Sequence, residues 1–285
     1  MKKISFLLMI IILFFGACNT VKKTFENDLQ QNFVDAPTHN EILTENDISS
    51  LPIPVQKYLS RCGFVGKEKV VNAEVIWSES AIKMAPEKDW MKLKTIQFNS
   101  CEIPFRIAYM KAHIAGIIPF DGRDIFSDGQ GQMLGKIANL FTVFDARERE
   151  ISQSALAIIL AEALLIPGYA LSDYIYWEEV DDRTAIGTIQ WKGIVVKGKF
   201  YFNDNYEMIL FETFDRYWTS PEGNVLAHFT AEISNYKKSG DYIIPGTLTA
   251  IWNIEHEGKD IRYDYWKGNI EEVRYNIRIQ DKNNH

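Results

Sequence analysis

Side chains that could do chemistry are few in this sequence, and their spacings fit no established site. Gly129 and Gly131 are followed by Gly135, whereas a dinucleotide-binding loop needs its third glycine three positions after the second. Neither a phosphate-binding loop nor a Gly-x-Ser-x-Gly nucleophile turn occurs. We therefore expect no metal and no cofactor. The five histidines, which lack the spacing of metal ligands, are His39, His113, His228, His256 and His285.

Glu162 is the only charged residue between Ile151 and Ser172. A carboxylate in such an apolar stretch either reaches a water-filled cleft or pairs with a cation. Arg183 and Arg216 are the partners that we consider. Two interpretations stay open, an ion pair that stabilises the fold and a carboxylate that serves a hydrolase.

Tryptophans recur in segments that we expect to be strands. Aromatic side chains favour half-buried sheet surfaces, so most of these should build the core. The functional alternative is that some line a pocket for an apolar molecule. Together with Glu162 and its neighbours they give a candidate ligand-binding set. This set comprises Ile158, Glu162, Leu165, Trp177, Arg216, Tyr217, Trp252 and Trp266.

One long helix is expected over residues 152–166. Ser152 or Ser154 can cap its start, and Pro167-Gly168 can stop it. A helix that is apolar on nearly every side is either buried or in lipid. This apolar run is too short to span a bilayer, so we expect the helix to be buried against a sheet.

Alternation of apolar and polar residues dominates the chain from Val70 onward and predicts strands. Short turns such as Asp128-Gly129 favour an antiparallel meander, since parallel strands would need a crossover helix each time. A short helix should begin near Pro54 and end at Gly63. The predicted fold is mainly β (α+β), an antiparallel curved sheet or half-barrel wrapped around one long apolar helix. The clearest predicted strands cover residues 71–78, 196–202, 208–218, 227–234, 247–254 and 273–280.

The first 17 residues have the layout of a secretory signal, with Lys2 and Lys3 ahead of an apolar stretch. Gly16-Ala17-Cys18 resembles the lipobox of bacterial lipoproteins, in which the cysteine receives fatty acyl chains such as palmitate and becomes the first residue. We therefore expect lipidation at Cys18 and anchoring in the cell envelope. Asn19 in place of aspartate favours the outer membrane by analogy. The alternatives are a secretory cut near Ala17 or an uncleaved membrane helix.

Polar composition over residues 18–50 predicts a flexible tether, which leaves residues 51–285 as a single β-rich domain. The chain carries a formal charge of −7, and it becomes more negative when Lys2 and Lys3 leave with the signal peptide. This balance makes nucleic acid an unlikely partner. Cys62 and Cys101 could form a disulfide in the envelope, or they are two buried thiols.

Several short motifs occur in order over residues 51–270 and resemble an uncharacterised bacterial domain family of unknown function. The stretch from Phe211 to Tyr217 departs from the family pattern, because it is longer than the usual spacing before Arg-Tyr. The resemblance implies a sheet-plus-helix pattern like that of lipoprotein carriers of the LolA and LolB type, whose incomplete barrel holds acyl chains. The motifs include Leu51-Pro52-Ile53-Pro54-Val55, Ile166-Pro167, Trp177-Glu178-Glu179-Val180-Asp181, Arg216-Tyr217 and Tyr265-Trp266-Lys267-Gly268.

Our leading hypothesis for function is a membrane-anchored lipoprotein that binds an apolar or amphipathic ligand such as a lipid. A hydrolase centred on Glu162 is the second hypothesis. The third is an interaction module of the envelope with a filled core and no ligand pocket.

Overall fold

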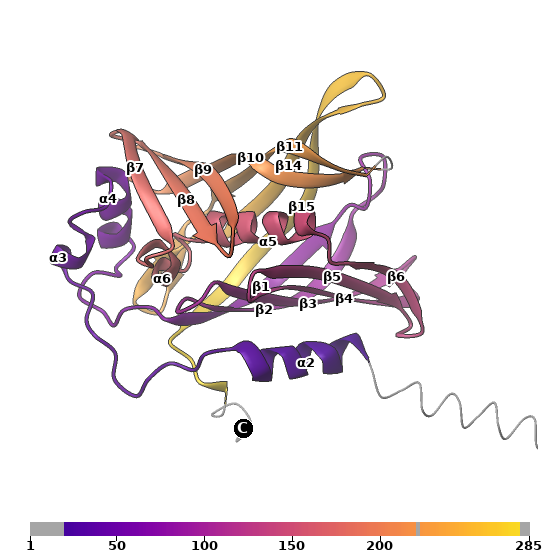
Figure 1. Cartoon of the computed structure of the whole chain (residues 1–285), viewed down its shortest axis with the longest axis horizontal. Coiled ribbons are helices and arrows are strands. Elements are labelled where there is room, and N and C mark those ends of the chain that lie inside the picture. The colour runs from indigo at the N-terminus through magenta and orange to yellow at the C-terminus, as the bar shows by residue number, and fades with distance from the viewer. Residues whose placement is uncertain (1–19, 221–222, 280–285) are drawn as a thin grey trace, which may run out of the picture.

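A computed structural model describes residues 20–220 and 223–279 (Figure 1). The predicted signal peptide and Cys18 lie outside the described residues. The five described helices are α2 (Val21–Asn32), α3 (Glu45–Ile48), α4 (Ile53–Arg61), α5 (Arg149–Ala161) and α6 (Pro167–Ala170). The strands are β1 (Asn72–Ile82), β2 (Met91–Ser100), β3 (Phe105–Ile114), β4 (Ile118–Ser127), β5 (Gln130–Ile137), β6 (Phe141–Ala146), β7 (Ile175–Asp181), β8 (Thr184–Trp191), β9 (Ile194–Phe202), β10 (Met208–Ser220), β11 (Gly223–Ser234), β12 (Lys237–Ser239), β13 (Tyr242–Ile244), β14 (Thr247–His256) and β15 (Lys259–Tyr275).

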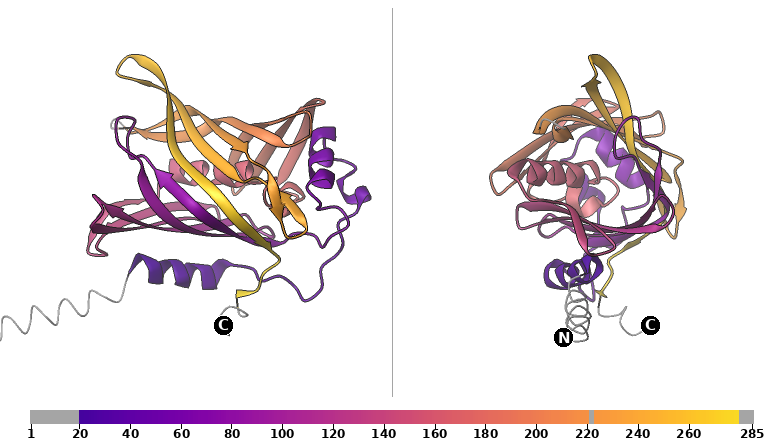
Figure 2. Two further views of the ribbon diagram at one scale, coloured as in Figure 1. Left: turned by 180° about the vertical axis from the view of Figure 1, so that it is seen from behind. Right: turned by 90° about the vertical axis from the view of Figure 1, so that its right-hand side faces the viewer.

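Thirteen strands form one antiparallel sheet in the order β6-β5-β4-β3-β2-β1-β15-β14-β11-β10-β9-β8-β7. The strands β6 and β7 follow one another in the chain but form opposite edges. The segment between them, which contains α5 and α6, therefore crosses the sheet. Figure 2 shows the sheet curving around α5. We call the face toward α5 the concave face and the other the convex face. The expected mainly β architecture, a curved antiparallel sheet or half-barrel, is confirmed.

The strand prediction for residues 273–280 holds only for 273–275, and residue 280 lies outside the described residues. Strand β15 ends at Tyr275, because Asn276 adopts a left-handed conformation with φ 55°. The Asn276 side chain accepts a hydrogen bond from Val71 N at 2.9 Å, and Ile277 N donates to Asn72 Oδ1 at 2.7 Å. These bonds turn the chain out of the sheet and bring Ile277 against an apolar cluster on the convex face.

The single helix expected over 152–166 is also corrected. Helix α5 begins earlier, at Arg149 after the N-cap Glu148, and ends at Ala161. Pro167 does not stop that helix but starts the short helix α6. The Ser152 hydroxyl accepts a hydrogen bond from Gly131 N at 2.9 Å, so it joins α5 to β5 rather than capping the helix. Gly131 permits this approach, because a Cβ there would lie 2.7 Å from Ser152 Cα.

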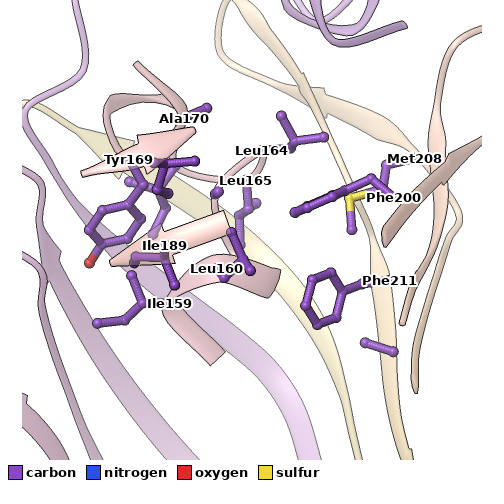
Figure 3. Packing of buried hydrophobic residues seen from close by; sticks show 14 of the residues in the cluster. Ile159, Leu160, Leu164, Leu165, Tyr169, Ala170, Ile189, Phe200, Met208 and Phe211 are labelled. Atoms are coloured by element: carbon purple, nitrogen blue, oxygen red, sulfur yellow. The ribbon is translucent and has the colours of Figure 1, made fainter. Parts of the chain in front are cut away.

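The main core lies between α5 and the concave face. Leu160 of α5 is buried together with Phe200 and Phe211 of β9 and β10 (Figure 3). The predicted helix near Pro54 is present as α4, and its Tyr58 and Leu59 join the same core. Cys62 and Cys101 are buried free thiols, so the disulfide considered from the sequence is not formed.

Residues 20–50 do not form the flexible tether that their polar composition suggested. Helix α2 lies along the convex face (Figure 2). Its Val21, Phe25 and Leu29 recur every fourth residue, share one face and are buried against β3, β4 and β5. An ion pair of 2.5 Å between Asp28 and Arg123 adds a polar contact. None of the described helices is long and apolar enough to cross a membrane.

We expect Phe25→Ala to lower the free energy of unfolding by about 3 kcal/mol, because it removes a buried ring. Phe25 is 5% exposed and packs against Tyr109, with ring centroids 5.6 Å apart. Urea unfolding measures the change. Glu26→Ala is the control, since that exposed side chain should alter stability by about 0.5 kcal/mol or less. Unchanged stability in Phe25→Ala would mean that α2 is not fastened to the sheet.

Cys62 and Cys101 should resist a thiol reagent in the native protein at pH 8. Burial raises the pKa of Cys62 to about 12 and raises that of Cys101 as well, so the reactive thiolate is scarce. After unfolding without reductant, peptide mass mapping should find both residues modified. A bridge between them would instead leave both unmodified until a reductant is added.

Candidate ligand-binding face

Two groups of polar side chains occupy the concave face. One surrounds Glu162 at the C-terminal end of α5, and the other surrounds Arg216 on β10. They differ in how completely their charges are paired, and this difference separates a structural role from a binding role.

Glu162 is the C-cap residue of α5 and is 8% exposed. Arg106 of β3 donates from Nε to both carboxylate oxygens, at 3.0 and 3.1 Å. Gln97 and Asn99 of β2 each donate a side-chain amide hydrogen bond to Glu162 Oε2 at 3.0 Å. The sheet therefore supplies a cation and two amides to one carboxylate, which ties the end of α5 to β2 and β3.

Arg106 connects this network to further groups. Its Nη1 donates to Asp124 Oδ2 and its Nη2 to Gln97 Oε1, both at 3.2 Å. Burial opposes the charge of Arg106, but the negative charges of Glu162 and Asp124 outweigh it and raise the pKa of the guanidinium. Asn99 also donates to the hydroxyl of Tyr169 at 3.2 Å. The network is thus charged, buried and almost fully hydrogen-bonded, as a structural ion pair needs to be.

The predicted partners of Glu162 are corrected. Arg216 lies in the second group, and Arg183 pairs with Asp204 at the surface. Arg106 was not predicted as a partner of Glu162. Gln97 and Asn99 were not predicted either, although they stand two positions apart on β2 and so share one strand face. In the parts of the chain that the structure describes, no cluster of side chains could hold a metal ion.

Arg216 reaches the concave face through a β-bulge. Thr213 pairs with Phe229, and Arg216 pairs with Ala227. Between these two pairs β10 advances by three residues while β11 advances by two. The extra residue reverses the alternation of side chains, and Arg216 therefore points to the same side as Thr213. The bulge lies within the segment from Phe211 to Tyr217, where the sequence was expected to depart from the family pattern.

The guanidinium of Arg216 lies over three aromatic rings. Its Cζ is 4.2 Å from the ring centroid of Phe229, 4.7 Å from that of Trp252 and 5.5 Å from that of Tyr265. Nη1 donates to the Tyr265 hydroxyl at 2.8 Å. Nε is buried without a hydrogen-bond partner. Among the described residues Arg216 forms no ion pair within 4.0 Å, so its positive charge has no counter-ion. We call Arg216, Phe229, Trp252 and Tyr265 the arginine–aromatic group.

Half-buried aromatic side chains continue from this group along the concave face. Trp266 follows Tyr265 in β15 and meets Trp77 edge to face, with centroids 4.9 Å apart. Trp77 Nε1 is a second buried donor without a partner. Trp266 also packs against a separate apolar cluster. That cluster is formed by Leu93, Ala112 and Phe120 with the partly buried Ile82, Met91, Met110, Ile114, Ile137 and Phe144.

The structure brings together only part of the candidate ligand-binding set. Arg216 and Trp252 belong to the arginine–aromatic group, and Trp266 is next to it in the chain. The other members lie elsewhere. Leu165 is buried in the main core, and Ile158 is partly buried on α5. Trp177 donates from Nε1 to Ala170 O at 2.9 Å. Tyr217 follows Arg216 in β10, so its side chain points to the convex face. Phe229, Tyr265 and Trp77 are contacts that the sequence did not single out.

A cleft of about 620 Å³ lies in another part of the molecule, between the β12–β13 hairpin and the end of β15. Its cations already have acidic partners. Lys67 pairs with Asp241 at 2.6 Å, and Arg274 pairs with Glu272 at 2.8 Å. It shares no lining residue with the arginine–aromatic group, and both of its cations are already paired with acids.

Comparisons with known proteins give one family and several distant folds. The model of a family of unknown function, DUF6544, matches residues 41–268. No curated protein matches the chain. A LolA superfamily protein from Nitrosomonas europaea is 10% identical, with a TM-score of 0.42, over 80% of this chain and 96% of that one. A DUF1329 family protein from Desulfovibrio piger is 8% identical, with a TM-score of 0.41, over 81% and 96%. With TM-scores below 0.5, these similarities transfer no function.

Replacing one partner of the Arg106–Glu162 pair should destabilise the fold more than replacing both. Arg106→Met leaves Glu162 buried without its cation, and we expect a loss of about 3 to 5 kcal/mol in the free energy of unfolding. The double variant Arg106→Met, Glu162→Leu should lose less than the sum of the single variants. Urea unfolding of the four proteins tests this. Exposed Arg183→Met is the control, with an expected loss below about 1 kcal/mol. Additive losses would show that the pair is not coupled.

Proposed function

The chain belongs to the family of unknown function DUF6544, and we propose that its domain binds an amphipathic molecule with an anionic headgroup on the concave face. The observation that carries this proposal is Arg216, a cation over three aromatic rings that forms no ion pair with any of the described residues. A guanidinium presents a planar fork of donors that suits a carboxylate or a phosphate. An anionic headgroup would supply the missing acceptor for such a fork.

The neighbours of Arg216 suit the apolar part of the same ligand. Trp266 belongs both to the main core and to the apolar cluster around Leu93, so half-buried apolar side chains continue away from the guanidinium. Met110 and Met91 in that cluster are flexible side chains that adapt to irregular apolar partners. An acyl chain lying along this strip would cover apolar surface while its headgroup meets Arg216.

We also propose that the protein works at the cell envelope, held in a membrane through acyl chains on Cys18. The support for this is the pattern of the first 18 residues. An amphipathic ligand and a membrane location agree chemically, since lipids supply molecules with an anionic head and an apolar tail. The outer membrane is the destination that Asn19 favours.

The hydrolase alternative has less support. The Glu162 carboxylate already accepts hydrogen bonds from Arg106, Gln97 and Asn99, so it is not free to act on a substrate. Asp124 is the nearest carboxylate in the network and is itself bonded to Arg106. The arrangement fits an anchor for α5 better than a general acid or base.

Binding of oleate, the carboxylate probe, should depend on Arg216. We expect Arg216→Met to weaken oleate binding by roughly tenfold or more, because a hydrogen bond to a charged group contributes about 1.5 to 3 kcal/mol. Oleyl alcohol has the same chain without the charge, so it should bind the native protein and Arg216→Met about equally. Displacement of a fluorescent fatty acid measures both affinities.

The matched control is Lys197→Met, which removes one positive charge from the convex face. Lys197 is 53% exposed and should leave oleate binding unchanged. Equal oleate affinity of the native protein and Arg216→Met would overturn the role of Arg216. Absence of binding by either probe to the native protein would overturn ligand binding on the concave face.

A further inference from the structure

Two neighbouring hairpin turns expose large apolar side chains at one corner of the sheet. Ile117 in the β3–β4 turn is 78% exposed, and Leu140 and Phe141 at the β5–β6 turn are 60% and 69% exposed. Turns usually carry small or polar residues, and contiguous exposed apolar surface marks a site of interaction. We call Ile117, Ile118, Leu140, Phe141 and Val143 the apolar corner.

The two turns are joined, so these residues form one surface. Ala138 N donates to Pro119 O at 2.8 Å, which connects the end of β5 to the start of β4. Phe120 and Ile137 pair across the same two strands. Strand β6, which carries Phe141 and Val143, is an edge of the sheet. The apolar corner is therefore an outer corner of the domain, beside an edge strand of the sheet that the described residues form.

The first described residues of the chain lie at this corner. Val21 N, at the start of α2, donates to Asn139 Oδ1 at 2.9 Å. Asn139 stands next to Leu140 in the β5–β6 turn, and Figure 1 shows α2 starting near that end of the sheet. Cys18 is three residues before Val21, a distance of about 10 Å at most for an extended chain. An acyl chain on Cys18 would thus enter the bilayer close to the apolar corner.

Charge near the corner suits a membrane surface. Lys22 and Lys23 are exposed at the start of α2. Lys22 lies 3.4 Å from the Glu26 carboxylate, and the Lys23 ammonium can meet an anionic headgroup. Lysine at the rim and large apolar side chains at the centre are the usual arrangement of an interfacial membrane contact.

We propose that the apolar corner is a membrane-contact surface, which lies in the bilayer interface beside the acylated Cys18. The orientation rests on the proposed anchoring at Cys18. The domain then touches the bilayer at two adjacent points, the acyl chains and the hairpin turns. The β3–β4 and β5–β6 turns face the membrane, and this contact holds the domain in one orientation.

Environment-sensitive fluorescence of the anchored protein tests this surface. The full chain is produced with its signal peptide and reconstituted in vesicles of phosphatidylethanolamine and phosphatidylglycerol. Leu140→Cys is labelled with a nitrobenzoxadiazole dye, while Cys62 and Cys101 are buried and stay unlabelled. We expect a blue-shifted emission of at least twice the intensity in water, and quenching by lipids that carry a nitroxide.

Val195→Cys provides the matched control, because Val195 is 50% exposed on β9, far from the corner in the strand order. Its dye should keep a water-like spectrum. A water-like spectrum at Leu140 overturns the proposal. A blue shift without vesicles that grows with protein concentration also overturns it, since the corner would then bind a second copy of the chain. The intact mass of the same preparation reports acylation of Cys18, so failure of the anchor is distinguished from failure of the corner. Oleate binding tests the concave face separately.

Discussion

The charge pair between Arg106 and Glu162 is the interaction on which the arrangement of the molecule depends. Apolar contacts hold α5 in the sheet without fixing its position along the strands, because the hydrophobic effect has no direction. Glu162 is the one charged residue near the end of that helix, and it can be buried only where donors meet it. Arg106, Gln97 and Asn99 meet it at one place on the sheet, and this contact fixes the C-terminal end of α5 against β2 and β3.

The path of the chain explains why that contact matters for the whole sheet. The segment that holds α5 connects β6 to β7, which are the two edges of thirteen strands. A helix that crosses the concave face between the edges requires the sheet to curl around it. The same curl turns the arginine–aromatic group toward the inside, while α2 covers part of the outside. The proposed binding face and the proposed membrane-contact surface therefore lie on different parts of one curved sheet.

Much of this fold could be predicted from alternation alone. Strands such as β9, β11 and β14 have one apolar and one polar face, and antiparallel pairing followed from the lack of crossover helices. The partner of Glu162 could not be predicted, since Arg106 is more than fifty residues away and nothing local marks it. The position of Arg216 could not be predicted either, because a bulge changes which side of the strand it faces. Helix α2 was hidden by polar composition, although Val21, Phe25 and Leu29 already had helical spacing.

The fastening of α2 limits how far the domain can move. A free coil of 32 residues would span roughly 30 Å, and a domain on it could reach partners well away from a bilayer. Only Asn19 and Thr20 separate Cys18 from α2. An acylated molecule of this build would diffuse sideways in its leaflet but could not ferry cargo across the gap to an opposite membrane. Any exchange would take place at the leaflet itself, or with a soluble acceptor that comes to it.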